Sequence, residues 1–127
     1  MDLSGTGFLY LPKWKYSLTS TIQLPTPDLV GHLSVTPAWS WTDKINCCFT
    51  LGLPQYYTTS PQMQNLNITA NLAQVAGNPQ LSTALIVTNV TQNQTMHGQW
   101  GVYEQLGQYA RAVAVPRMWA LQIRYSF

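Results

Sequence analysis

Apolar and polar residues alternate along most of the chain with a period of two. In residues 14–24 the even positions carry Trp14, Tyr16, Leu18, Ile22 and Leu24, apart from one serine, whereas the odd positions carry lysine, serine, threonine and glutamine. This is the period of a β-strand with one apolar and one polar face, and the spacing of three and four residues that marks an amphipathic helix is almost absent. The pattern therefore predicts an all-β fold.

Five strands are predicted in this way, and they are expected to run antiparallel, up and down. Their approximate ranges are 14–24, 29–42, 63–73, 81–90 and 117–127, within a single segment that covers residues 1–127. The connections alternate in length, with short turns at 25–28 and 74–80 and long irregular stretches at about 42–62 and 91–115. Pro37 lacks the amide hydrogen that a strand ladder uses, so a bulge or a weakly paired position is expected there.

Three features favour a transmembrane β-barrel over a soluble sandwich. A strand such as 14–24 is about 36 Å long at ~3.3 Å per residue, and a tilt of ~40° projects this to about 28 Å, close to the apolar band of an outer-membrane barrel. Short turns on one side and long loops on the other are typical of these barrels. Aromatic side chains also lie at strand ends, as an interfacial girdle requires, and the candidate girdle is Trp14, Tyr16, Trp39 and Trp41.

The composition narrows the classes of function. Of the 127 residues 8% are charged and 46% are apolar, with a formal net charge of +2. Such a chain is too apolar for intrinsic disorder and too weakly basic for a phosphate-binding footprint, so no nucleic-acid partner is expected. No apolar run approaches the roughly 20 residues that a spanning helix needs.

The titratable residues form no recognisable catalytic or metal centre. The two histidines lack a ligand partner, the four acids are scattered over turns and loops, and the two cysteines are adjacent, which rarely satisfies disulfide geometry. These residues are His32, His97, Asp2, Asp28, Asp43, Glu104, Cys47 and Cys48. We expect no enzyme activity, no metal and no cofactor, and the sequence assigns no role to the cysteines.

Several segments resemble, in order and spacing, the C-terminal end of TonB-dependent outer-membrane receptors. In that family the last strand runs from a Pro-Arg-aromatic start to a terminal phenylalanine, as residues 115–127 (VPRMWALQIRYSF) do here. Residues 89–92 (NVTQ) resemble the Asn-Leu-Thr-Asp that ends the penultimate strand, with glutamine in place of aspartate. The segments 11–18 (LPKWKYSL), 41–43 (WTD) and 66–70 (LNITA) also agree, so the resemblance covers nearly the whole chain.

The resemblance implies a place in the bacterial outer membrane, in the wall of a 22-stranded barrel that takes up siderophores or similar nutrients. Five strands form only part of such a barrel, so the chain is expected to be incomplete alone and to pair with the remainder of a parent barrel or with further copies of itself. Lipid and the outer-membrane assembly machinery are the other implied partners. The last strand resembles the C-terminal signal that this machinery captures, through Trp119, Leu121, Ile123, Tyr125 and Phe127.

If the apolar faces meet lipid, the polar faces line the barrel lumen. For any single one of these residues an ordinary solvated polar face is the favoured interpretation, and the lumen assignment is conditional on the barrel. The lumen-facing candidates are Lys15, His32, Asn65, Asn67, Thr69, Asn71, Gln122 and Arg124.

Two other classes of protein remain open. The first is a self-assembling structural β-protein, in which edge-paired copies of receptor-like strands form a ring or a fibre; it predicts concentration-dependent oligomers that resist SDS. The second is a soluble β-sandwich that binds glycans through exposed aromatic residues. It predicts solubility without detergent, which the low charge disfavours.

Overall fold

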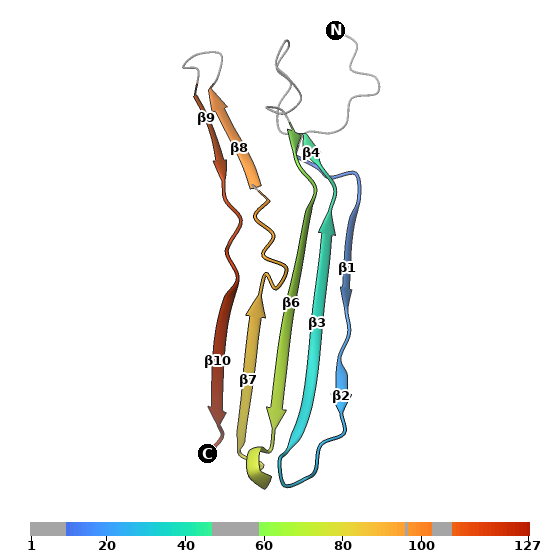
Figure 1. Ribbon diagram of the computed structural model, residues 1–127, viewed down its shortest axis with the longest axis vertical. Helices are drawn as coiled ribbons and strands as arrows, with labels where there is room; N and C mark the ends of the chain where they lie inside the picture. The colour runs from blue at the N-terminus through green and yellow to red at the C-terminus, as the bar shows by residue number, and fades with distance from the viewer. Residues whose placement is uncertain (1–9, 47–58, 96, 103–107) are drawn as a thin grey trace. The chain divides into compact units, whose positions relative to one another are not determined.

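The structure is a computed structural model that describes residues 10–46, 59–95, 97–102 and 108–127, and it is all-β (Figure 1). Cys47 and Cys48 lie outside these ranges, as do Asp2 and Glu104. The described residues contain no helix with the length and apolarity to cross a membrane. The elements are β1 (Lys15–Thr19), β2 (Ile22–Leu24), β3 (His32–Thr42), β4 (Ile45–Asn46), β5 (Thr59–Ser60), β6 (Met63–Ala73), the 3-10 turn η1 (Val75–Gly77), β7 (Leu81–Thr88), β8 (His97–Val102), β9 (Gln108–Ala112) and β10 (Met118–Tyr125).

The main sheet has the strand order β1-β3-β6-β7-β10, with β2 also paired to β3. The pairs β2/β3, β6/β7 and β7/β10 are antiparallel. Each strand of this sheet therefore lies beside the strand of the sheet that comes next along the chain, as in an up-and-down meander (Figure 1). The predicted all-β class with antiparallel strands is confirmed, and the sheet is open, with β10 at one edge and β1 at the other.

The two stretches expected to be irregular contain additional strand pairs, so that expectation is wrong. Strands β4 and β5 pair within the first stretch, and β8 and β9, which follow β7 and precede β10 along the chain, form an antiparallel pair within the second. The β8/β9 ladder carries a register shift between His97 and Gln99. The two sequences, HGQWGV and QYARA, are too short to show a clear period of two, and cross-strand backbone bonds can form without such a pattern.

The strand expected over 14–24 is divided into β1 and β2 at Ser20 and Thr21. The β2/β3 register pairs Ile22 with Val35, so Ser20 stands opposite Pro37. The Ser20 amide donates to the Pro37 carbonyl at 3.2 Å, but proline has no N–H to return the bond. Of the two alternatives expected at Pro37, the structure shows the weakly paired position, and the neighbouring strand is interrupted opposite it.

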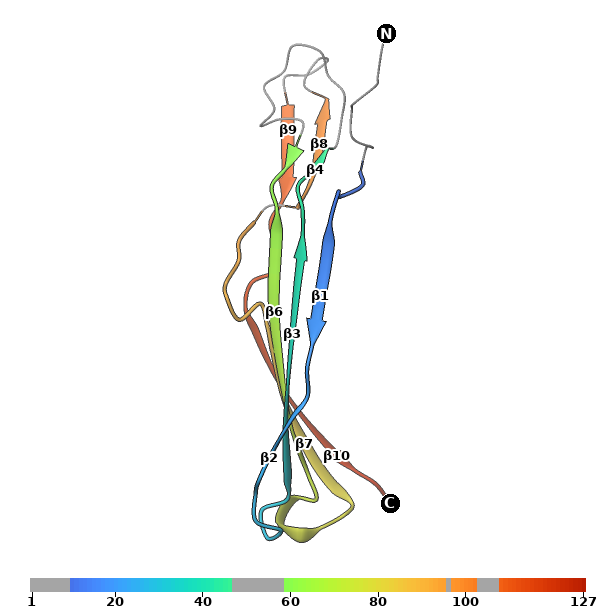
Figure 2. The same cartoon turned by 90° about the vertical axis from the view of Figure 1, so that its right-hand side faces the viewer.

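The chain divides into two compact units, which we describe separately. The first, here called the sheet unit, comprises residues 17–40, 65–92 and 116–127; the second comprises 1–16, 41–64 and 93–115. In the sheet unit the strands form one layer (Figure 2), and its only buried apolar side chains among the described residues are the small ones of Ala84 and Val87. This unit therefore has no core of large side chains within the part that the structure describes.

Close backbone packing joins the β2/β3 turn to the end of β6. Gly31 has φ +110°, and a Cβ built on it would collide with the carbonyl oxygen of Ala73. The neighbouring Val30 carbonyl accepts a hydrogen bond from the Ala76 amide at 3.4 Å. Only glycine can adopt this positive φ without strain and also leave room for the Ala73 carbonyl.

We predict that Gly31→Ala lowers the free energy of unfolding by about 2 kcal/mol or more, because the methyl group meets backbone that has to move. Gly77→Ala is the matched control, since Gly77 has φ +74° but nothing within 4 Å of its added Cβ. The control is expected to cost about 1 kcal/mol. Urea midpoints in detergent micelles measure both, and equal losses would contradict the proposed collision.

Candidate functional site

The register of β7 with both of its neighbours defines two faces of the sheet unit. Residues that pair across an antiparallel ladder point to the same face. On one face the rows across β6, β7 and β10 are Ile68–Val87–Trp119, Ala70–Leu85–Leu121 and Leu72–Thr83–Ile123. This face, here called the apolar face, is open: Trp119, Leu121 and Ile123 are 64%, 68% and 68% exposed.

The residues predicted to form a C-terminal signal fall on or beside the apolar face. Trp119, Leu121, Ile123 and Tyr125 alternate along β10 on this face, and Phe127, just beyond the strand, is fully exposed. The Phe127 ring meets the Tyr125 ring edge-on, with their centroids 5.3 Å apart.

The end of β10 is held against the start of β7 by Gln80. The Tyr125 hydroxyl donates to Gln80 Oε1 at 2.8 Å, and the Ser126 amide donates to the Gln80 carbonyl at 2.9 Å. At the other end of β10, the Arg117 guanidinium lies 5.9 Å from the centre of the Trp119 ring. A cation over an aromatic face is a favourable contact, so both ends of the strand are ordered by polar groups.

Three of the four girdle residues form an aromatic cluster in the second unit. The rings of Trp14 and Tyr16 are parallel within 6° at 6.4 Å, and Tyr16 meets Trp41 at 5.5 Å. The Asp43 amide donates to the Trp14 carbonyl at 3.0 Å, which holds the two chain segments together. Trp39, the fourth residue, lies in the sheet unit, two positions before Trp41 in β3 and 38% exposed.

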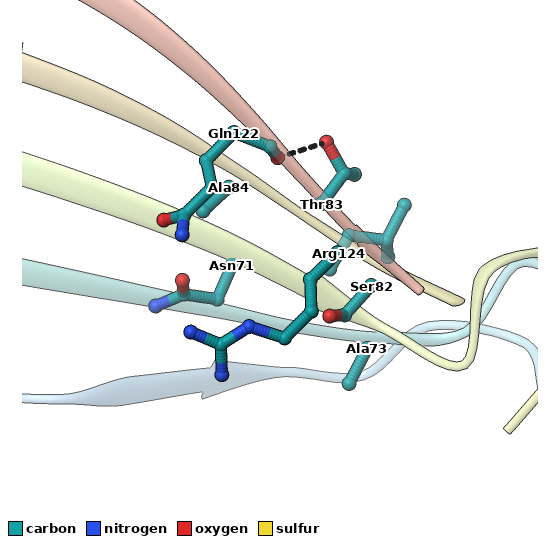
Figure 3. A pocket seen from close by; sticks show the side chains of 8 residues that line it. Asn71, Ala73, Ser82, Thr83, Ala84, Gln122 and Arg124 are labelled. Carbon is teal, nitrogen blue, oxygen red and sulfur yellow. Dashed lines mark hydrogen bonds between the residues drawn. The ribbon is translucent and has the colours of Figure 1, made fainter. Parts of the chain in front are cut away.

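The opposite face of β6, β7 and β10 carries a small pocket. Its rows are Asn71–Ala84–Gln122 and Ala73–Ser82–Arg124, in which small residues of β7 lie between longer polar residues of β6 and β10. The result is a shallow depression of about 170 Å³, here called the polar hollow (Figure 3). It brings together three of the predicted lumen-facing residues, Asn71, Gln122 and Arg124.

The other lumen-facing candidates are spread over the strands. Lys15 in β1 and His32 in β3 are exposed, while Asn65 and Thr69 lie on the same face of β6 as Asn71. This face is not uniformly polar, because Ile86 and Met118 also lie on it.

Asn67 has a structural role that the sequence pattern did not reveal. Its Oδ1 accepts the Asn89 amide at 3.0 Å, and the Val90 amide donates to the Leu66 carbonyl at 2.8 Å. Asn89 itself has φ +49° and is buried, so the chain turns sharply as β7 ends. The sequence signal for this turn is Asn89 itself, which lies near the end of a predicted strand, since asparagine tolerates the left-handed conformation.

No group of three or more His, Cys, Asp or Glu residues that could hold a metal ion occurs in the described part of the chain. No protein-family model, no curated protein and no solved structure matches the chain. Function is therefore inferred from the two faces of the sheet unit and from the sequence.

We predict that Asn67→Ala destabilises the protein by about 1–3 kcal/mol, because the buried Asn89 amide loses its acceptor. Asn67→Asp keeps an acceptor oxygen in place and is expected to cost less. Asn71→Ala, on the same face of β6, is the control and is expected to change stability little. Amide hydrogen exchange at Asn89 and urea midpoints test this; unchanged exchange at Asn89 in Asn67→Ala would contradict it.

Proposed function

We propose that the chain is part of the wall of a transmembrane β-barrel in the bacterial outer membrane, of the TonB-dependent receptor type that takes up siderophores or similar nutrients. One observation carries the proposal. The registered strands β6, β7 and β10 expose large apolar side chains on one face and carry the polar hollow on the other, in a single layer. A barrel wall between lipid and an aqueous lumen needs these two faces.

The energetic argument concerns the apolar face. Each of Trp119, Leu121 and Ile123 would gain about 1.5–3 kcal/mol on full burial, and each is about two-thirds exposed. For the exposed two-thirds the sum is about 3–6 kcal/mol, which overlaps the lower part of the whole stability of a small domain, about 5–15 kcal/mol. Covering the apolar face with an apolar environment is therefore favourable, and in this proposal lipid supplies that environment.

The strand lengths and the aromatic cluster agree with a bilayer. Strands β3 and β6 each have 11 residues. At ~3.3 Å per residue and a tilt of ~40° each spans about 28 Å, close to the apolar band of about 25 Å. The cluster of Trp14, Tyr16 and Trp41 supplies amphipathic rings suited to the interface.

The edge strands explain why the chain needs neighbours. Strand β10 has β7 on one side only within the described sheet. In lipid each unpaired backbone group costs several kcal/mol, so an open edge would cost on the order of tens of kcal/mol. Other strands of a parent receptor close the wall in this proposal, and the segments at about 42–62 and 91–115 contribute to its extracellular loops.

We predict that spin labels on adjacent residues of β10 report opposite environments when the full chain, carrying Cys47→Ser and Cys48→Ser, is reconstituted in lipid vesicles. Labels at Leu121→Cys should be accessible to oxygen, which partitions into lipid, and labels at Gln122→Cys to a water-soluble nickel chelate. Electron paramagnetic resonance measures both accessibilities. Ile123→Cys and Arg124→Cys form the second pair and should repeat the alternation.

Two outcomes of this experiment would contradict the barrel wall. Nickel access at all four sites, in vesicle-bound chain that shows the circular dichroism of a β-sheet, would mean that the folded strand lies in water. Exclusion of both reagents at Leu121 and Ile123 would mean that protein covers the apolar face, as in the glycan-binding sandwich.

The open edges also favour a second candidate, a self-assembling structural protein in which copies of this chain pair edge to edge. We predict that the chain as a receptor segment sediments in detergent at its own 14.2 kDa across a dilution series. Closed oligomers that survive SDS would instead establish the self-assembling candidate. Analytical ultracentrifugation with density-matched detergent makes the measurement.

A further inference from the structure

The polar hollow has the geometry of a small binding site. In β7 the side chains of Ser82 and Ala84 are short, whereas Asn71 on β6 and Gln122 and Arg124 on β10 are long. Figure 3 shows the Arg124 guanidinium and the two amides on the same side of the sheet, around the short residues. The volume of about 170 Å³ is below the 300–1,000 Å³ of sites for drug-sized ligands, so only a small molecule fits.

Backbone and side-chain bonds hold the hollow in shape. Strand β7 pairs with β6 on one side and with β10 on the other throughout this region. The Thr83 hydroxyl also donates to the Gln122 carbonyl at 3.0 Å, across the β7/β10 border (Figure 3). The long polar residues therefore stand on a paired backbone rather than on a loop.

Arg124 gives the hollow a single positive charge. It is the only charged residue of β6, β7 and β10, and within the described residues it has no ion-pair partner. A guanidinium presents a rigid fork of N–H donors that matches the two oxygens of a carboxylate. One carboxylate balances this charge, whereas the second charge of a phosphate dianion has no counterpart here.

The uncharged polar side chains around the polar hollow are suited to bind hydroxyl groups of a ligand. The amides of Asn71 and Gln122 each offer a donor and an acceptor, and the Ser82 hydroxyl offers both. A ligand with hydroxyl groups next to its carboxylate can use all of them. We propose that the polar hollow binds a small hydroxylated carboxylate, with Arg124 holding the carboxylate and Asn71, Gln122 and Ser82 the hydroxyl groups.

Glycerate and propionate form a matched pair of probes, because they share a three-carbon carboxylate and differ only in two hydroxyl groups. The full chain, isotope-labelled and folded in detergent micelles, is titrated with each sodium salt while side-chain amide resonances of Asn71 and Gln122 and the Nε–H resonance of Arg124 are followed. Glycerate should shift all three saturably. Propionate should bind at least about fivefold more weakly than glycerate, because the neutral hydrogen bonds to the two hydroxyl groups are lost.

Arg124→Gln should weaken glycerate binding at least about tenfold, because a charge-assisted bond is removed. Arg117→Gln is the control, since Arg117 is on the apolar side over Trp119, and it should leave binding unchanged. Sodium chloride at matched ionic strength should produce no saturable shift.

Three outcomes would overturn the site. If chloride and glycerate shift the resonances equally, the shifts come from ionic screening and not from binding at the polar hollow. If propionate binds as tightly as glycerate, the amides do not hold the hydroxyl groups. Tighter binding of phosphate at pH 8 would overturn the assignment to carboxylates. Because the wild-type titration alone decides these outcomes, they hold even where Arg124→Gln fails to fold. The inference does not rest on the proposed barrel, because it needs only β6, β7 and β10.

Discussion

The backbone ladder on both sides of β7 is the interaction on which the rest of the sheet unit depends. Its register with β6 and β10 decides which side chains share a face, because side chains alternate strictly along a strand. A shift of one residue would carry Leu121 and Ile123 to the side of the polar hollow and Gln122 and Arg124 to the apolar side. Both the apolar face and the hollow are consequences of one hydrogen-bonding pattern.

A sheet held in this way is stabilised mainly by its backbone bonds, because the described residues of the sheet unit bury only small apolar side chains. In a water-soluble sheet, stability comes from covering one face with a second layer. Here large apolar side chains such as Trp119 are exposed, and no second layer covers them within the described residues. In the function proposed above, lipid takes the place of this second layer, and further strands pair with the open edges of the described sheet.

Where the strand ladder is interrupted or ends, individual residues supply hydrogen bonds in its place. Ser20 bonds to Pro37 on one side only, Asn67 accepts the amide left by the turn at Asn89, and Gln80 holds the last residues of β10. Gly31 lets two turns approach at the end of the sheet. These positions lie at interruptions and ends of strands, which is where backbone groups would otherwise lose their partners.

The period-two pattern alone was sufficient for the all-β class and for the ranges of the long strands, because each has an apolar and a polar side. Strand β6 covers the expected 63–73, and β10 differs from the expected range by a residue or two at each end. The pattern could not find β8 and β9, because strands of 6 and 5 residues are too short to show a clear period. Nor could it show that Asn71 lies beside Gln122 and Arg124, since residues about 50 positions apart are brought together only by register. For the same reason it could not show that Asn67 bonds to the amide of Asn89, 22 positions away. The sequence by itself determined which face of each strand is apolar, because alternation is local. Tertiary structure decided which faces adjoin and where a hollow forms, because cross-strand pairing is not local.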